Sequence, residues 1–185
     1  MRITPLRTDG HAGLLGLGSC PGKSDADLSA IARRQLLESD IRVVRSWNAK
    51  ALVSVLEDGE LKALKVEDVG ASATRVGIWW FRTPIKRGAA PDDRFWRAWP
   101  QAAPALLEIL RHAQRVVVHS DTHDGRAGLV ACCLLAELGL SANEALSTVR
   151  AADTVVTQSP VHELFIREYL PRFPEHTRMR SPRND

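Results

Sequence analysis

Hydrophobic positions in this chain follow two spacings, one typical of buried strands and the other of amphipathic helices. Short apolar runs predict buried strands at 51–56, 78–81 and 116–119. Apolar residues three and four positions apart predict helices at 25–40, 60–66, 95–112, 126–138, 141–150 and 159–169, and residues 72–77 form the end of another. Residues 1–23 contain short apolar pieces broken by glycines, which predicts a strand and turns.

Strands that alternate with helices predict an α/β fold with a central, mainly parallel sheet flanked by helices. The length of 185 residues fits a single domain. We place this domain at 1–170, followed by a flexible basic tail at 171–185. In such sheets the ligand site lies at the carboxyl ends of the strands, so the loop after the 116–119 strand is the first candidate.

Some helix ends have sequence signals of their own. Ser24 or Asp25 is placed to cap the first long helix. Pro100 lies inside the helix predicted at 95–112 and marks an alternative start for it. Ser141 and Glu144 have the spacing of a capping box, which predicts a helix start between them.

The composition is that of a globular protein, with 44% hydrophobic and 25% charged residues. No stretch approaches the roughly 20 apolar residues that span a bilayer, and the start lacks a signal-sequence pattern. We therefore expect a cytoplasmic protein without membrane association. Cys20, Cys132 and Cys133 have neither the number of a disulfide framework nor the spacing of metal ligands. The sequence does not fix the oligomeric state.

The formal net charge of +3 and the isoelectric point near 9.0 lean basic. The basic residues are spread along the chain, except for a cluster in the tail at 172–183. Nucleic-acid binding calls for a denser basic stripe interleaved with aromatic residues. The charge therefore favours an anionic ligand and does not favour nucleic acid.

The segment 116–128 reads Val-Val-Val-His-Ser-Asp-Thr-His-Asp-Gly-Arg-Ala-Gly and predicts a strand, a tight loop and a helix start. This arrangement points backbone N–H groups and a helix N-terminus at a phosphate. The candidate phosphate-binding residues are Ser120, Asp121, Thr122, His123, Asp124, Gly125 and Arg126. Asp121, His123 and Asp124 also suggest a metal site, although a solvated polar turn is the commoner outcome, and we assign no metal.

With its His, a small residue, five further residues and an Arg, this segment resembles the phosphate loop of the protein tyrosine phosphatase superfamily. The chain is most similar to the dual-specificity-like, kinase-associated phosphatase group. Three further segments resemble that group in the same order: 15–23 its N-terminal signature, 84–92 its mobile acid-bearing loop, and 158–160 the entry to its last helix. The resemblance covers 14–169 and implies a single-domain Cys-phosphatase-type fold that needs no cofactor.

The resemblance also assigns roles to residues. In the family a Cys thiolate attacks phosphorus, an Arg and loop amides hold the phosphoryl oxygens, an Asp protonates the leaving oxygen and a Gln places the water. Arg126 matches the phosphate-binding Arg, and His119 matches the His before the nucleophile. Ser120 replaces the Cys, Arg87 stands at the general-acid position and His162 stands where the Gln is expected.

These departures bear on activity. A Ser hydroxyl titrates far above a Cys thiol, so Ser120 stays protonated where a Cys would be a thiolate. Arg87 binds anions but cannot donate a proton at working pH. Asp92 and Asp93 lie on the same loop and are candidates to replace the missing acid, although Asp before a helix is more commonly a cap. Asp121 and Asp124 would repel a phosphate dianion unless they point outward.

We therefore expect a phosphatase-fold protein that binds phosphate or a phosphorylated protein or small molecule, with phosphoester hydrolysis weak or absent. Three alternatives stay open. The chain is an inactive or altered form of an active protein phosphatase, a different hydrolase using a rebuilt loop around His123 and Asp124, or an interaction protein whose loop binds nothing.

Overall fold

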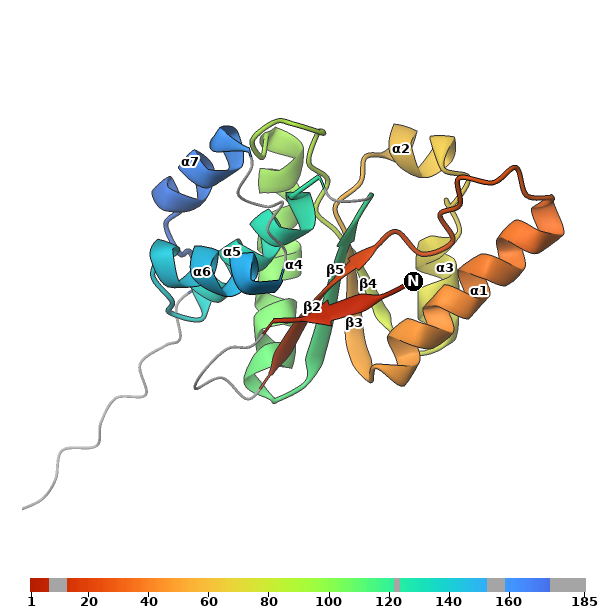
Figure 1. The fold of residues 1–185 in the computed structure, drawn as a ribbon. Coiled ribbons are helices and arrows are strands. Elements are labelled where there is room, and N and C mark those ends of the chain that lie inside the picture. The colour runs from red at the N-terminus through yellow and green to blue at the C-terminus, as the bar shows by residue number, and fades with distance from the viewer. Residues whose placement is uncertain (7–12, 122–123, 153–158, 174–185) are drawn as a thin grey trace, which may run out of the picture.

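The computed structural model describes residues 1–6, 13–121, 124–152 and 159–173, and its centre is a five-stranded sheet (Figure 1). The strands are β1 (Ile3–Pro5), β2 (Leu14–Ser19), β3 (Ala49–Ser54), β4 (Trp79–Arg82) and β5 (Arg115–Ser120). Their order is β1-β2-β5-β3-β4. β1 pairs antiparallel with β2, whereas β2, β5, β3 and β4 are parallel neighbours. The predicted α/β fold with a mainly parallel central sheet is confirmed.

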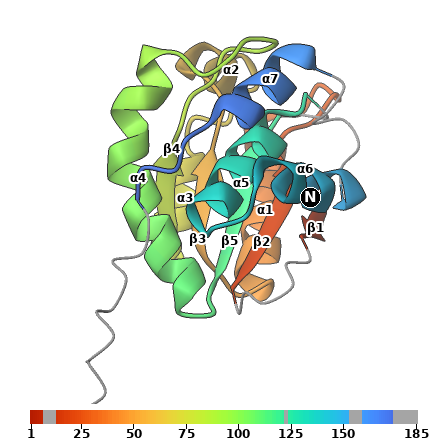
Figure 2. The same cartoon turned by 90° about the vertical axis from the view of Figure 1, so that its left-hand side faces the viewer.

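Helices cover both faces of the sheet. The helices are α1 (Ala30–Ser46), α2 (Asp58–Ala63), α3 (Val69–Arg75), α4 (Asp93–Arg111), α5 (Arg126–Glu137), α6 (Ala142–Ala152) and α7 (Pro160–Glu168). α1 and α3 pack on one face, and α4 and α5 pack on the other, where α6 and α7 pack against α5. Figure 2 looks onto this second face and shows α5 in front of the strands. No described helix is both long and apolar enough to cross a bilayer.

The two faces of the sheet belong to two hydrophobic cores, because side chains of a strand alternate between faces. Val116 and Val118 lie in the core beneath α4 and α5, and Val117 lies in the core beneath α1 and α3. The central position of β5 explains why its sequence is continuously apolar. Burial raises the pKa of Cys132, on α5, to about 12, so this thiol behaves as a small hydrophobic side chain.

The first long helix was misplaced at its start. α1 begins at Ala30, not at residue 25, and its cap is Ser29, whose hydroxyl accepts from the Ala32 N–H at 3.2 Å. Neither predicted cap begins α1, and the Ser24 hydroxyl instead accepts from the Ala26 N–H in a local turn at 3.1 Å. The apolar pattern misled at this end because Leu28 fits the helical spacing yet lies before the first residue of α1.

The starts of α4 and α6 test two further predictions made from the sequence. α4 begins at Asp93 and runs through both Pro100 and Pro104, so the break at Pro100 does not occur. Both prolines lie on the exposed side of α4, where water can bond carbonyls that lose a helical donor. The capping box is confirmed, since Glu144 accepts from the Ser141 N–H at 2.8 Å and the Ser141 hydroxyl accepts from the Glu144 N–H at 3.3 Å.

Candidate functional site

The predicted phosphate loop leaves the central strand at the carboxyl edge of the sheet. β5 ends at Ser120, which is 4% exposed, and α5 begins at Arg126. Gly125 precedes the helix with φ of 75°, a left-handed conformation that favours glycine. Thr122 and His123 lie outside the described residues. The strand-to-helix geometry is thus the one predicted from the sequence.

Arg126 is fully buried and its guanidinium is held by two carboxylates. Asp124 Oδ2 accepts from Nε at 2.8 Å and lies 2.6 Å from Nη2. Glu60 accepts through both oxygens, from Nη1 and Nη2, each at 2.7 Å. The Ile85 carbonyl accepts from Nη1 at 2.7 Å. An Arg side chain has five N–H donors, so the protein itself supplies an acceptor for each one.

The electrostatics of this cluster favour its charged form. Burial alone would lower the pKa of Arg126, but hydrogen bonds to Glu60 and Asp124 outweigh burial and raise it above the ordinary Arg value. Burial opposes the charge of Glu60 too, yet its bonds from Arg126 and from the Glu57 N–H lower the pKa of this carboxyl. Glu60 is positioned by α2, where it forms a capping box with Glu57.

Asp121, the residue after Ser120, joins two further segments to the site. Its carboxylate lies 2.5 Å from Lys23 Nζ and pairs with the guanidinium of Arg87. Burial would raise the pKa of Asp121, but the two cations outweigh burial and lower it. Arg87 also lies 3.7 Å from Glu60. Arg87, which the resemblance places at the general-acid position, is therefore a partner of the loop and not a free anion-binding side chain.

These contacts form a line of alternating charges, which we call the ion-pair chain. Its members in order are Lys23, Asp121, Arg87, Glu60, Arg126 and Asp124. Three cations meet three carboxylates, so the formal charges cancel. The two loop carboxylates do not point outward, which was the condition for a phosphate to approach without repulsion. Each is paired inward, so a phosphate would compete with them for the same cations.

His119 is held away from Ser120. Neighbouring residues of a strand point to opposite faces, and the His119 Nε2 lies 2.6 Å from the Ser54 hydroxyl on β3. Ser54 accepts from the Trp80 indole N–H at 2.7 Å, so its own proton is free to go to His119. Burial lowers the pKa of His119 to about 3, which keeps the ring neutral. The ring joins three strands and is not placed as a base for Ser120.

The alternative acid candidates have structural partners. Asp92 caps α4, since its carboxylate accepts from the Arg94 N–H at 2.9 Å and pairs with the Arg94 guanidinium at 2.6 Å. The hydrogen bond from Arg94 lowers the pKa of Asp92, so this carboxyl has no proton to give near neutral pH. Asp93, in the first turn of α4, is exposed. The structure therefore places Asp92 as a helix cap.

His162 and Cys20 lie close to the ion-pair chain. His162 is buried on α7 and its Nε2 lies 3.1 Å from the Ala89 carbonyl, so it contacts the loop between β4 and α4. Burial lowers its pKa. Burial also raises the pKa of Cys20 to about 12, which makes that thiol unreactive. Within the described residues, no group of three His, Cys, Asp or Glu side chains could hold a metal ion.

Sequence analysis missed Glu60 and Ser54. Glu60 had a local signal, because Glu57 and Glu60 have capping-box spacing. That signal predicts a helix start but not a contact with Arg126, which is 66 residues further along the chain. Ser54 had no signal of its own beyond its place within the strand predicted at 51–56, and it is the last residue of β3.

Comparisons with known proteins were made on sequence and on structure. No protein-family model and no curated protein matches this sequence. Solved structures do match. Kinase associated phosphatase (KAP), with its catalytic-site cysteine substituted by serine, has a TM-score of 0.77 and 22% identity over 91% of this chain and 93% of that chain. Tk-PTP in its active form has a TM-score of 0.62 and 23% identity, over 92% and 100%. PTPMT1 in complex with PI(5)P has a TM-score of 0.60 and 17% identity, over 83% and 88%. The chain therefore has the fold of the tyrosine and dual-specificity phosphatases.

Proposed function

We propose that this chain belongs to the tyrosine phosphatase superfamily, in its kinase-associated group, and binds a phosphate group or a phosphorylated partner with little or no hydrolysis. Loop 120–126, at the carboxyl edge of the sheet, is the binding element, and Arg126 is its principal cation. The fold and the buried Arg126 at the start of α5 support this assignment.

The exchanged reactive groups support weak or absent hydrolysis. Phosphoryl transfer in this fold needs a strong nucleophile and an acid for the leaving oxygen. Ser120 offers a hydroxyl, and the adjacent His119 is bonded to Ser54 on the other side of the strand. Arg87 stands at the acid position and is paired with Asp121, so it has no proton to donate.

One observation carries the binding half of the proposal: Asp124 occupies one edge of the Arg126 guanidinium. Its carboxylate lies against Nε and Nη2 at 2.8 and 2.6 Å, the planar fork that two phosphate oxygens would use. Asp124 thus stands in for the ligand in the free protein. A phosphate group binds by replacing this carboxylate while Glu60 keeps the other edge.

Hydrolysis of an aryl phosphate from about pH 5 to pH 8 tests the catalytic half. The unaltered chain is expected to be silent, and Ser120→Cys with Arg87→Asp is expected to show turnover, because it restores both missing groups. Ser120→Cys alone is the matched intermediate and is expected to be slower than the double variant. Turnover by the unaltered chain would overturn the proposal of weak or absent hydrolysis.

Titration with inorganic phosphate, monitored by calorimetry, tests the binding half of the proposal. Asp124→Asn keeps an oxygen for the Arg126 backbone N–H, which bonds Asp124 Oδ1 at 3.1 Å, but removes the competing charge. We expect its phosphate affinity to rise by about tenfold, which corresponds to about 1.4 kcal/mol. Asp93→Asn, at an exposed position, is the charge-matched control and should leave the affinity unchanged. Absence of phosphate binding in every form would overturn loop 120–126 as a phosphate site.

A further inference from the structure

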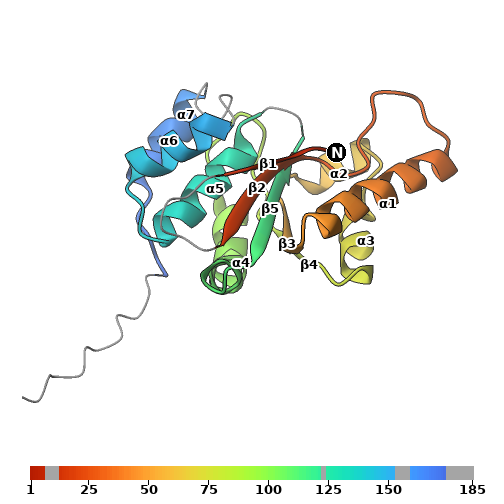
Figure 3. The ribbon, with the colours of Figure 1, turned by 60° about the horizontal axis from the view of Figure 1, so that its bottom comes forward.

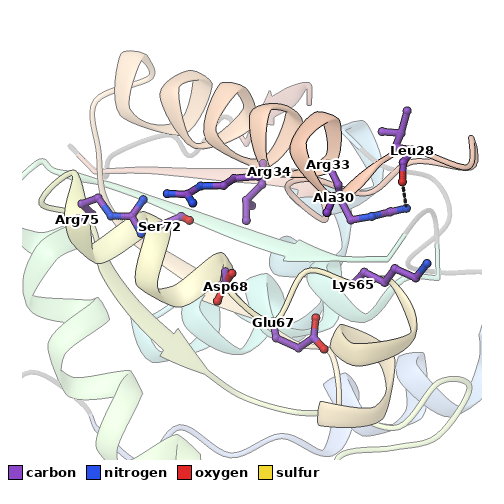
Figure 4. Close-up of a pocket in the computed structure, with 10 residues that line it drawn as sticks. Leu28, Ala30, Arg33, Arg34, Lys65, Glu67, Asp68, Ser72 and Arg75 are labelled. Atoms are coloured by element: carbon purple, nitrogen blue, oxygen red, sulfur yellow. Dashed lines mark hydrogen bonds between the residues drawn. The ribbon is translucent and has the colours of Figure 1, made fainter.

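A groove of about 440 Å³ lies between α1 and α3, and none of its residues belongs to the ion-pair chain (Figure 4). α1 contributes Ala30, Arg33, Arg34 and Leu37 to one wall, and α3 contributes Ser72 and Arg75 to the other. Leu28, Lys65, Glu67 and Asp68 complete the lining. Four of these side chains are basic and two are acidic, so the lining carries a net positive charge.

The groove-facing side of α1 has an unusual pattern. Leu37, Ile41 and Val44 recur at helical spacing and are buried in the core. The same face continues toward the helix start as Ala30, Arg33 and Arg34, and no residue of 30–36 is buried. A helix face that packs inside one protein is normally apolar. The first turns of α1 instead extend to the outer edge of the molecule, as Figure 3 shows. They carry Arg33, which is partly exposed, and Arg34, which is exposed.

The arginines of the groove have fewer carboxylate partners than guanidinium groups. Glu38 Oε1 lies 3.2 Å from Arg34 Nε and 3.9 Å from Arg75 Nη1, so one carboxylate serves two guanidinium groups. The Arg34 and Arg75 side chains are 74% and 57% exposed. Arg33 donates to the Leu28 carbonyl at 3.3 Å, a neutral acceptor. Arg34 and Arg75 therefore converge from the two walls with charge left for a ligand.

We propose that this groove binds an acidic segment of a partner protein. Carboxylates of that segment would pair with Arg34 and Arg75, and Arg33 and Lys65 would attract its flanking acids. The two acidic residues of the lining, Glu67 and Asp68, favour a peptide over a nucleic acid. Glu67 and Asp68 repel a chain with a phosphate at every unit, whereas a peptide offers them backbone N–H donors.

Because the ion pairs in this groove would be exposed to solvent, we expect weak, salt-dependent binding. Solvent-exposed ion pairs are individually weak and are screened by salt. A segment bound through several of them binds loosely and reversibly, with an affinity that falls as salt increases.

Fluorescence anisotropy in low salt, with a labelled peptide in which Glu alternates with Gly, tests the proposal. Arg34→Glu with Arg75→Glu is expected to weaken binding by about tenfold or more, because it converts attraction into repulsion. Arg42→Glu with Arg97→Glu changes the net charge equally at exposed positions outside the groove. This control should bind nearly as well as the unaltered chain. Equal loss in both double variants would show general charge attraction and overturn the groove as the site.

A second arm separates the classes of partner. A single-stranded oligonucleotide of the same charge is titrated under the same conditions, and the peptide is expected to bind more tightly. Glu67→Gln with Asp68→Asn removes the two acidic side chains of the groove. We expect this variant to bind the oligonucleotide more tightly, so the difference between its affinities for peptide and oligonucleotide should become smaller. Tighter binding of the oligonucleotide to the unaltered chain, lost in the Arg34 and Arg75 variant, would overturn the peptide assignment in favour of a nucleic-acid surface.

Discussion

The ion-pair chain and the α1–α3 groove both gather basic side chains, but the two regions differ in burial. Arg126 is 0% exposed and two carboxylates hold its guanidinium, whereas Arg34 is 74% exposed and shares one carboxylate with Arg75. A buried charge is stable only when it is paired and hydrogen-bonded, so burial forces partners on Arg126. An exposed Arg keeps its hydration and needs no partner.

This difference changes what a ligand must do. Under the two proposals, a phosphate at loop 120–126 has to replace the Asp124 carboxylate, whereas an acidic segment in the groove displaces mainly water and mobile ions. The two proposed anion sites therefore differ in access. One is closed by the chain itself and the other is open.

The largest expected effect is on stability at the closed site. Arg126→Met removes the only cation shared by Asp124 and Glu60 in the ion-pair chain, and their side chains are 7% and 20% exposed. Leaving buried charge without its partner costs about 3–5 kcal/mol. Urea denaturation measures the free energy of unfolding. Arg87→Met, at a side chain 57% exposed, is the control and should cost far less. A loss below about 1 kcal/mol for Arg126→Met would contradict tight pairing.

The next effect is a pH dependence of stability caused by His119. The pKa of this ring in the folded chain, about 3, lies below the ordinary value of about 6.5. Below about pH 6.5 the His119 ring therefore binds a proton in the unfolded chain but stays neutral in the folded chain. Stability from the neutral ring is complete above that pH and falls with acidification, by at most about 1.4 kcal/mol per pH unit.

Urea denaturation at several values between about pH 5 and pH 8 measures this slope. His119→Asn should flatten the slope, while His112→Asn, at an exposed position, should leave it unchanged. The lowered pKa of His162 acts in the same direction, so a residual slope is expected in the His119 variant. An unchanged slope in His119→Asn would show that this ring does not titrate as its burial implies.

A smaller effect concerns the end of the ion-pair chain where Asp121 is buried and its partner Arg87 is 57% exposed. Asp121→Asn weakens the pairing with both Lys23 and Arg87, and we expect a loss of about 1–2 kcal/mol at neutral pH. The lowered pKa of Asp121 means that its contribution is present above about pH 4 and is lost as pH falls further. A double-mutant cycle with Arg87→Ala measures the pair itself. Additive losses would show that Arg87 and Asp121 do not interact.

Strands β3, β4 and β5 and the loop-to-helix junction were predictable because their signals are local, whereas the one strand expected in 1–23 is two, β1 and β2. A run of valines marks a central strand, and Gly125 followed by Arg126 marks the helix start. The start of α1 was not predictable from apolar spacing, because Leu28 fits the helical pattern yet lies before the helix. The helix begins where the Ser29 hydroxyl accepts from the Ala32 N–H, and apolar spacing does not report such a cap.

The site divides in the same way. Motif spacing identified Ser120 and Arg126 as residues of one loop, and the structure brings both to the carboxyl edge of the sheet. Motif spacing could not identify Glu60 as the second carboxylate that pairs with Arg126, because pairing between residues far apart in the sequence leaves no local pattern. For the same reason, the pairing of Asp121 with Lys23 and Arg87 depends on three loops meeting at one edge.

The smallest expected effect on stability tests the open site. Glu38 pairs with two arginines of the groove as Asp124 pairs with Arg126 at the loop, so each carboxylate would compete with a ligand for Arg. Glu38→Gln removes only exposed pairs with Arg34 and Arg75, so the free energy of unfolding should change by less than about 0.5 kcal/mol. The affinity of this variant for the acidic peptide should nevertheless rise a few-fold, because both guanidinium groups lose their internal partner. Anisotropy titration beside urea denaturation measures the two quantities together. Unchanged affinity would mean that Glu38 does not compete for these arginines, and the contrast between the closed and the open site would then rest on burial alone.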